Sequence, residues 1–484
     1  MLAVLAGICA CGHKDDPEEP KEEQERLVTI NTFAYNVMNI YYLWKDDISE
    51  GLSSWKLDDD PAEKVKDIRY KDANGKDIDK WTALYEDLDA MKRSTAGVNT
   101  TYGFDFKLYY TDSSQTGVCM VVTLVYPDSP AEKAGFKRGD VFLKIGGKSM
   151  TRDNYVDLLY DGFLYAPKAT LTDDSGKAFD LTAVEMYENP VLVTKVFEFG
   201  GKKVGYLLFN SFTLNASHDL IEAGKFFTSN GIDDLILDMR YNGGGYVFTE
   251  TVLASMLAPI AEVQAGSVFE TAVYNDILAK AWKDKTTRFA EDLTYKDEDL
   301  EFSVSIAGAN PGIKHLYAIM TGDSASAAES ILVGLMPYLD IKIFGEQSHG
   351  KYCTGMMYSA KDWYKDYDEE LDDKQRERGN KYADKWGIYV MIARYADKYG
   401  NTPCMPDGFM PDIPVQDNPV EPYPLGDPRE VMLSKVLTYL GAETGRPAGR
   451  SAAHAPARAI GAEIPLERDP LDYAHILLPQ DLLH

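Results

Sequence analysis

Residues 321–329 read Thr-Gly-Asp-Ser-Ala-Ser-Ala-Ala-Glu, directly after an apolar run that ends at Met320. This pattern predicts a strand, a turn of small residues and a helix that begins near Ala327. A serine in that turn would lie at a helix N-terminus, where unpaired N–H groups and the helix dipole stabilise a developing negative charge. A simpler interpretation also fits, in which Ser324 and Ser326 only cap the helix.

Two other segments carry a comparable signal. Residues 235–245, Leu-Ile-Leu-Asp-Met-Arg-Tyr-Asn-Gly-Gly-Gly, predict a buried strand that runs into a triple-glycine turn. Glycines there let backbone N–H groups approach a reacting oxygen without a Cβ clash. Residues 344–355, Phe-Gly-Glu-Gln-Ser-His-Gly-Lys-Tyr-Cys-Thr-Gly, place Lys351 between a glycine and an apolar strand. Each segment alone is a weak signal, since glycine-rich strand ends and surface lysines are common.

The region around these segments alternates between strand-like and helix-like runs. Strands are predicted at 203–209, 234–239 and 316–320, and helices at 219–229, 249–257 and 327–338. This alternation predicts an α/β core over residues 189–425. Two stretches, about 265–305 and 362–385, look like insertions, and we expect both to be solvated helical surface.

The two ends of the chain differ from this core. Residues 26–98 predict a small helical domain, with helical spacing at 33–44 and again at 80–91. Residues 426–484 predict a helix that Asp427 caps, with Pro428 at its first position and a close at Gly441. From residue 442 onward Ala, Pro, Arg and Gly dominate, and we expect a largely disordered tail.

A β-rich domain is predicted over residues 99–188. Its centre, residues 126–148, contains the run Ser-Pro-Ala-Glu-Lys-Ala-Gly-Phe-Lys-Arg-Gly-Asp, which resembles the middle of a PDZ domain. PDZ domains add an extended peptide to a sheet edge. The loop that binds a terminal carboxylate would comprise Gly103, Phe104, Asp105 and Phe106. Because Asp105 stands where a second glycine is common, we expect the groove to prefer internal or amidated segments, or to act mainly as a lid.

Together, the motifs resemble the tail-specific, or C-terminal processing, serine peptidases. That resemblance implies a crotonase-like α/β core behind a PDZ domain, with Ser326 as nucleophile and Lys351, 25 residues later, as base. It also implies an oxyanion hole formed by the N–H groups of Ala327 and Gly244. A free lysine titrates near ~10.4, so burial must lower its pKa by roughly 3 units before it acts as a base at neutral pH.

The chain departs from the family pattern at one position beside the lysine. Gly355 replaces a glutamine that often orients the lysine, and Thr354 or Ser348 is a candidate substitute, unless the dyad works without a third member. His349 is interpreted as pocket lining. Two alternatives stay open: a catalytically weak or inactive peptide-binding PDZ lipoprotein, and a binder of apolar ligands.

Composition excludes some other functions. The 484 residues carry 77 acidic and 50 basic side chains, a net charge of −27, which argues against binding a nucleic-acid backbone. The hydrophobic fraction of 45% is enough for a sizeable core. Neither a C-x-x-C nor an H-E-x-x-H motif occurs, so the sequence predicts neither a metal nor a cofactor. The expected partners are polypeptide substrates.

The N-terminus predicts export. Residues 1–11 are mostly apolar, and Ile8-Cys9-Ala10-Cys11 resembles a bacterial lipobox that would lead to lipidation of Cys11. The charged stretch to residue 25 reads as a tether, so we expect an outer-membrane lipoprotein in the cell envelope, facing the cell surface, with no other membrane contact. In the fold that the resemblance implies, Cys353 and Cys404 lie near one another, and we expect a disulfide between them.

Overall fold

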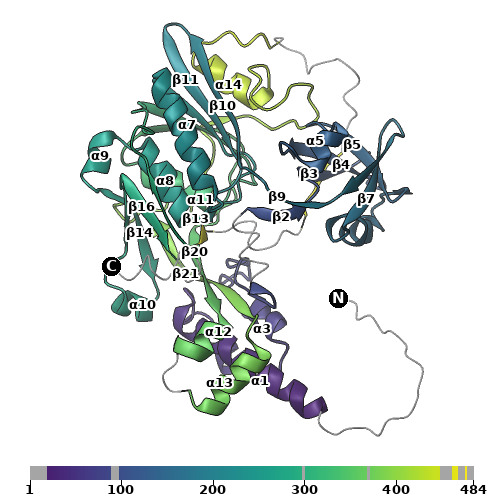
Figure 1. The fold of residues 1–484 in the computed structure, drawn as a ribbon, viewed down its shortest axis with the longest axis vertical. Coiled ribbons are helices and arrows are strands. Elements are labelled where there is room, and N and C mark those ends of the chain that lie inside the picture. The colour runs from purple at the N-terminus through teal and green to yellow at the C-terminus, as the bar shows by residue number, and fades with distance from the viewer. Residues whose placement is uncertain are drawn as a thin grey trace.

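The structure is a computed structural model that describes residues 19–88, 97–296, 300–367, 371–446, 461–466 and 475–476. It has three parts: helices at one end, an α/β core, and a β-rich domain beside that core (Figure 1). This confirms the predicted fold class. The lipobox and Cys11 lie outside the described residues. Among the described helices, none combines the length and apolar character that crossing a bilayer requires.

The helical part comprises α1 (Glu19–Tyr41), α2 (Ser49–Ser53) and α3 (Pro61–Asp67). The expected helix over residues 80–91 is wrong for most of its length. Residues Ala83–Tyr85 instead form strand β1, which pairs with strand β21 (Gly387–Ala396) of the core. Its apolar side chains, including the buried Trp81, therefore pack against the core rather than within a helical bundle.

The charged stretch at 362–385 is helical, as predicted, but it is more than solvated surface. It forms α12 (Ala360–Asp362), the π-helix η2 (Trp363–Tyr367) and α13 (Asp373–Tyr382). Trp363 and Tyr364 are buried, and the Tyr364 hydroxyl donates to the carbonyl of Thr29 at 2.7 Å. Helices α12 and α13 therefore lie beside α1 in one body (Figure 1).

The β-rich domain is built on one sheet in the order β23-β3-β4-β5-β7-β8, with β6 on β5. Its elements are β3 (Phe104–Tyr110), β4 (Val118–Val125), α5 (Pro130–Ala134), β5 (Val141–Ile145), β6 (Lys148–Ser149), α6 (Tyr155–Leu159), η1 (Tyr160–Leu164), β7 (Lys168–Asp173) and β8 (Ala178–Thr182). Ser129 caps α5 and Gly135 ends it in the left-handed region, as their positions predicted. A two-stranded ribbon, β2 (Val98–Thr101) with β9 (Val184–Tyr187), leads to the core.

The first core sheet has the order β10-β11-β12-β18-β19-β22. Its strands are β10 (Val191–Phe199), β11 (Lys202–Phe209), β12 (Asp234–Asp238), β18 (His315–Met320), β19 (Asp340–Gly345) and β22 (Ile413–Pro414), parallel from β11 onward. Helices α7 (Ala216–Asn230), α8 (Val247–Leu257) and α11 (Ala327–Leu335) share one hydrophobic cluster with alternate strand residues. The other face packs against α14 (Val431–Tyr439).

The second core sheet has the order β13-β24-β20-β21-β14-β15, with β1 on β21. It contains β13 (Gly245–Tyr246), β14 (Val268–Tyr274), β15 (Thr286–Arg288), β20 (Cys353–Ser359) and the tail strand β24 (His475–Ile476). The expectation of a helical surface at 265–305 is therefore wrong. Apart from α10 (Asp276–Ala281), that stretch gives β14, β15 and the hairpin of β16 (Asp292–Lys296) with β17 (Glu301–Ser305). Phe269 and Tyr295 are buried, which explains the strand pattern.

The C-terminal region differs from expectation in two ways. Helix α14 begins at Val431 with Glu430 as its cap, three residues after the predicted cap Asp427. The expected disordered tail contributes two strands, β23 (Glu463–Ile464) on the β-rich domain and β24 in the second core sheet. Residues 447–460, 467–474 and 477–484 of the tail lie outside the described residues.

Candidate active site

The three motif segments lie at the carboxyl ends of neighbouring parallel strands β12, β18 and β19, so the fold places them at one edge of the sheet. Backbone hydrogen bonds join them. The N–H of Ala325 donates to the carbonyl of Asn242 at 3.0 Å, and the N–H of His349 donates to the carbonyl of Ser324 at 3.0 Å. The loops that the sequence singled out separately therefore form one site.

Ser326 lies in a strained turn immediately before α11. Its φ of 60° and ψ of −114° are unusual for a residue with a side chain. Its side chain is buried, and its Oγ has no hydrogen-bond partner among the described residues. Ser324, in contrast, donates its hydroxyl to the carbonyl of Met239 at 2.7 Å, so it is a structural link between two loops. Neither serine therefore serves only as a helix cap.

Glu329 is a residue that the sequence reasoning left without a role. Its buried carboxylate accepts the N–H groups of Ser326 at 3.1 Å, Gly350 at 2.8 Å and Lys351 at 2.9 Å, and the Ser348 hydroxyl at 2.5 Å. Burial raises the pKa of Glu329 to about 7, against the lowering effect of these hydrogen bonds. One side chain therefore holds the backbones of Ser326 and Lys351 together.

Tyr395 reinforces this arrangement from β21. Its hydroxyl lies 2.5 Å from the carbonyl oxygen of Lys351 and 3.4 Å from that of Ser326. The side chain is fully buried. The two residues that the motifs indicated are thus neighbours that share contacts with both Glu329 and Tyr395.

The Lys351 side chain is completely buried in an aromatic environment. Its Nζ lies 5.3 Å from the ring centroid of Trp81 and 3.2 Å from the hydroxyl of Tyr389. Desolvation lowers the pKa of Lys351 to about 8, although the nearby acidic groups partly oppose the shift. This is the direction that the sequence argument required. The Trp81 contribution could not be foreseen, because its segment was expected to be a helix.

Tyr389 occupies the position beside the lysine that Gly355 leaves open. A Cβ on residue 355 would collide with the Tyr389 ring, so only glycine lets that ring approach. Of the predicted substitutes, Ser348 donates to Glu329 and accepts the N–H of Phe409 at 2.7 Å. Its hydroxyl therefore organises Glu329 and its loop. Tyr389 is the side chain whose hydroxyl lies within hydrogen-bonding distance of Lys351 Nζ.

The glycine turn after β12 is held by its own asparagine. The N–H of Gly244 donates to Asn242 Oδ1 at 2.9 Å, and the Asn242 amide donates to the carbonyl of Phe209 at 3.0 Å. Gly244 has a φ of 111°, a conformation that favours glycine. Ala327 is the first residue of α11, where N–H groups lack partners within the helix. The N–H that Gly244 was predicted to supply is therefore already engaged.

The expected disulfide is not formed. Cys353 and Cys404 are buried free thiols, and Cys119 is also buried. The sulfur of Cys404 lies 3.6 Å from the Tyr395 hydroxyl. Burial raises the pKa of both the Cys353 and Cys404 thiols. The segments are near one another, as expected, but the two side chains serve as packing groups.

The predicted pocket-lining role of His349 stays a prediction, although its ring lies close to Trp81. Burial lowers its pKa to about 4, so the imidazole is neutral at neutral pH. Its ring lies 6.2 Å from that of Trp81, and its Nδ1 lies 3.2 Å from the carbonyl oxygen of Gly322. Within the described residues there is no cluster of three or more His, Cys, Asp or Glu side chains suited to a metal ion.

Polar contacts join the β-rich domain to the site. Arg138 donates to the Tyr241 hydroxyl at 2.5 Å and to Asp417 at 2.7 Å. The Asp105 carboxylate accepts the Tyr126 hydroxyl and the Asn210 amide, each at 3.2 Å. The carboxylate of Asp105, whose negative charge was the reason to expect poor binding of a peptide carboxylate, is thus held between the β-rich domain and the core. The predicted preference for internal or amidated segments therefore loses its electrostatic argument and stays a prediction.

Comparisons with known proteins agree with this architecture. Residues 203–415 match the model of peptidase family S41, and residues 121–162 match a PDZ domain model. A solved structure from Bacteroides fragilis, described as an S41 protease, has a TM-score of 0.63 and 20% identity. The match covers 84% of this chain and 97% of that chain, and it shows the common fold.

Two curated relatives are similar in sequence. The chloroplastic C-terminal processing peptidase of Tetradesmus obliquus is 29% identical over 35% of this chain, and this chain spans only 39% of its length. The carboxyl-terminal-processing protease of a Picosynechococcus species is 24% identical, over 73% of each chain. The chain therefore carries a peptidase domain of family S41 with a PDZ domain before it, which confirms the family that the motifs indicated.

Proposed function

We propose that this protein is a serine endopeptidase of the C-terminal processing type, with Ser326 as nucleophile and Lys351 as general base. One arrangement carries the proposal. Lys351 is fully buried with a pKa of about 8, and its backbone contacts the same two side chains, Glu329 and Tyr395, as the backbone of Ser326. The Ser326 backbone is strained, and its Oγ has no hydrogen-bond partner among the described residues. Hydroxyl nucleophiles need an adjacent base, and a desolvated lysine is one.

In the proposed reaction, neutral Lys351 accepts the proton of Ser326 Oγ as the oxygen attacks the peptide carbonyl. The resulting ammonium then protonates the leaving amine, which departs and leaves an acyl-enzyme. Neutral Lys351 next takes a proton from water, which attacks the ester carbonyl. The Lys351 ammonium then returns a proton to Ser326 Oγ as the ester bond breaks and the acid product leaves. Ser326 Oγ makes no hydrogen bond to a described residue, and the contact between a nucleophile and its base often forms fully only with substrate bound.

The oxyanion hole is part of the same proposal. The N–H groups of Ala327 and Gly244 would bind the developing oxyanion. Because Asn242 Oδ1 accepts the Gly244 N–H, the substrate oxygen must displace that side chain. The hole is therefore completed on substrate binding.

Cleavage of unfolded casein tests the function. Ser326→Ala should remove cleavage, while the wild type remains active in the presence of a metal chelator. Ser229→Ala, on the surface end of α7, is the matched serine control and should cleave at the wild-type rate. Undiminished cleavage by Ser326→Ala would refute the assignment. A wild type that binds casein without cleaving it would favour a peptide-binding protein instead.

The pH dependence of activity follows from Lys351. The protonated lysine is inactive as a base, and its pKa is about 8, so kcat/KM should rise with pH and level off above about 8. Initial rates on a fluorogenic peptide between pH 5.5 and 10 would measure this profile. A rate that is independent of pH across this range would contradict a lysine base.

Tyr389 is proposed to position the lysine. Tyr389→Phe should lower kcat about tenfold with little change in KM, because the base loses its orientation. The kinetic pKa should also fall, since the ammonium loses a hydrogen-bond acceptor. Tyr399→Phe, whose side chain is exposed, is the control. A changed KM with an unchanged pH profile would indicate a merely structural role.

The site of action is proposed from the N-terminal motif. Lipidation of Cys11 would anchor the enzyme in the cell envelope, where exported polypeptides are its substrates. Cells fed a labelled fatty acid should incorporate it into the wild type but not into Cys11→Ser. Label retained in that variant would exclude Cys11 as the anchor.

A further inference from the structure

The tail strand β23 lies on the edge of the PDZ sheet that follows the carboxylate loop. It pairs antiparallel with β3, with Glu463 opposite Tyr109 and Ile464 opposite Leu108. The N–H of Tyr110 donates to the carbonyl of Ala462 at 3.0 Å, and the N–H of Gly461 donates to that of Tyr110 at 2.7 Å. The tail therefore adds a strand to the sheet, which is how extended peptides bind such domains.

The polarity and side chains of this segment also resemble those of a bound peptide. Because β3 starts at the carboxylate loop and the pair is antiparallel, the tail runs toward that loop. Ile464 is 6% exposed and belongs to the PDZ core, and Leu466 packs against the same cluster. The tail therefore fills the edge of β3 with its backbone and packs Ile464 and Leu466 against the PDZ core, where a peptide ligand would bind.

A lysine connects this tail strand to the catalytic loop. Lys107 Nζ on β3 lies 3.1 Å from Glu463 and 2.8 Å from Asp323, three residues before Ser326. Burial of the lysine would lower its pKa, but the two carboxylates outweigh this effect and raise it. The docked tail is therefore part of an ion-pair network that reaches the proposed nucleophile's loop.

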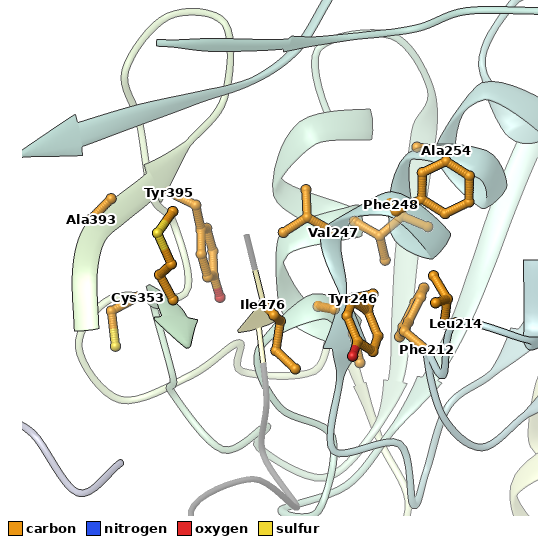
Figure 2. Packing of buried hydrophobic residues seen from close by; sticks show 14 of the residues in the cluster. Phe212, Leu214, Tyr246, Val247, Phe248, Ala254, Cys353, Ala393, Tyr395 and Ile476 are labelled. Atoms are coloured by element: carbon orange, nitrogen blue, oxygen red, sulfur yellow. The ribbon is translucent and has the colours of Figure 1, made fainter. Parts of the chain in front are cut away.

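The second tail strand, β24, lies inside the peptidase sheet. It is parallel to β13, with His475 opposite Gly245 and Ile476 opposite Tyr246, and it also pairs with Gly355 of β20. Figure 2 shows Ile476 among the side chains around Tyr246 and Tyr395, and it is 1% exposed. One neighbouring strand follows the oxyanion glycine and the other follows Lys351. The tail thus fills a strand position between the two halves of the site.

We propose that residues 461–466 and 475–476 are a built-in competitor of substrate. The first segment occupies the PDZ groove, and the second occupies the strand position between the two halves of the proposed active site. This inference rests on the proposed function for its effect on cleavage. Each paired segment is only two residues long, so each binds weakly alone. Tethering raises the effective concentration of both to the millimolar range and keeps them docked until a longer peptide displaces them.

Binding to the PDZ groove tests the first half without any catalysis. In the Ser326→Ala background, a fluorescent peptide copying residues 459–468 should bind the chain truncated after Arg446 at least tenfold more tightly than the full chain. Ile464→Asp in the full chain should also strengthen binding of that peptide, which guards against misfolding of the truncated form. Ile260→Asp, at an exposed position on α9 (Ile260–Gln264), is the matched control. Equal binding to all forms would overturn the inference.

Steady-state cleavage tests the second half. Truncation after Arg446 and Ile476→Asp should each lower KM for a peptide substrate at least tenfold and leave kcat within twofold. A peptide copying residues 470–480, added to the truncated enzyme, should inhibit competitively. An unchanged or raised KM in both variants would refute the competitor at the active site. If no form cleaves while the binding difference persists, the proposed function fails and the PDZ half stands.

Discussion

Replacement of Lys351 by Met should lower peptidase activity roughly 10³-fold or more, because the nucleophile loses its only proposed base. The same change should stabilise the fold. Moving the lysine pKa from 10.5 to about 8 costs roughly 3 kcal/mol of folding free energy at 1.36 kcal/mol per unit. A methionine of similar shape removes that cost, less the hydrogen bond to Tyr389. Activity assays and urea unfolding at pH 7 measure the two effects.

The sign of the pH dependence sharpens this test. Below about pH 8 the cost is fully present, and between pH 8 and about 10.5 the unfolded chain keeps a proton that the folded chain has lost. The free energy of unfolding of the wild type therefore rises relative to that of Lys351→Met as pH rises from about 8 to about 10.5. Lys280→Met, at an exposed lysine, should change neither activity nor stability by more than about 0.5 kcal/mol. A destabilised Lys351→Met at pH 7 would contradict the desolvation argument.

Replacement of Arg240 by Met should destabilise the fold by about 3–5 kcal/mol. The guanidinium is fully buried and donates to Asp238 at 2.7 Å, Glu430 at 2.7 Å and Asp417 at 3.0 Å. Without it, carboxylates from the end of β12 and the start of α14 remain buried with too little positive charge. Burial alone would raise the pKa of Asp417, but Arg138 and Arg240 lower it to about 2.

Urea midpoints measure the effect of this substitution. Arg429→Met provides the control, because Arg429 pairs with Asp427 while half of its side chain is exposed. Surface pairs contribute about 0–1 kcal/mol, so the control should stay close to the wild type. Similar losses for the two variants would show that the buried cluster has no special role in stability.

The sequence predicted the parts of the site that depend on local pattern. Ser326 and Lys351 lie where they do because the parallel strands before them end at the same edge of the sheet. A strand followed by a motif of about ten residues is enough to predict such a position from the sequence. The family resemblance supplied their roles. Glu329 stood within the quoted motif, yet its four contacts come from two loops, and such convergence is visible only in three dimensions.

The errors also share a physical cause. Residues 80–91 have apolar spacing that suits a helix, but an available edge of β21 makes strand β1 more favourable. Tyr389 lies 38 residues beyond Lys351, and only the missing side chain at Gly355 allows their contact. The two short tail strands were missed because their partners, β3 and β20, are distant in sequence and composition carries no sign of such pairing. Tertiary pairing overrides local propensity in each case.

The position of β24 means that an affinity tag at the C-terminus is expected to change the kinetics of the protein. Any extension beyond Ile476 continues from a strand that lies between β13 and β20, next to the proposed catalytic residues. The start of α1, in contrast, lies at the bottom of the molecule, away from β13 and β20 (Figure 1). We therefore expect preparations with an N-terminal tag and preparations with a C-terminal tag to differ in their kinetic constants. Rates from the two should not be pooled.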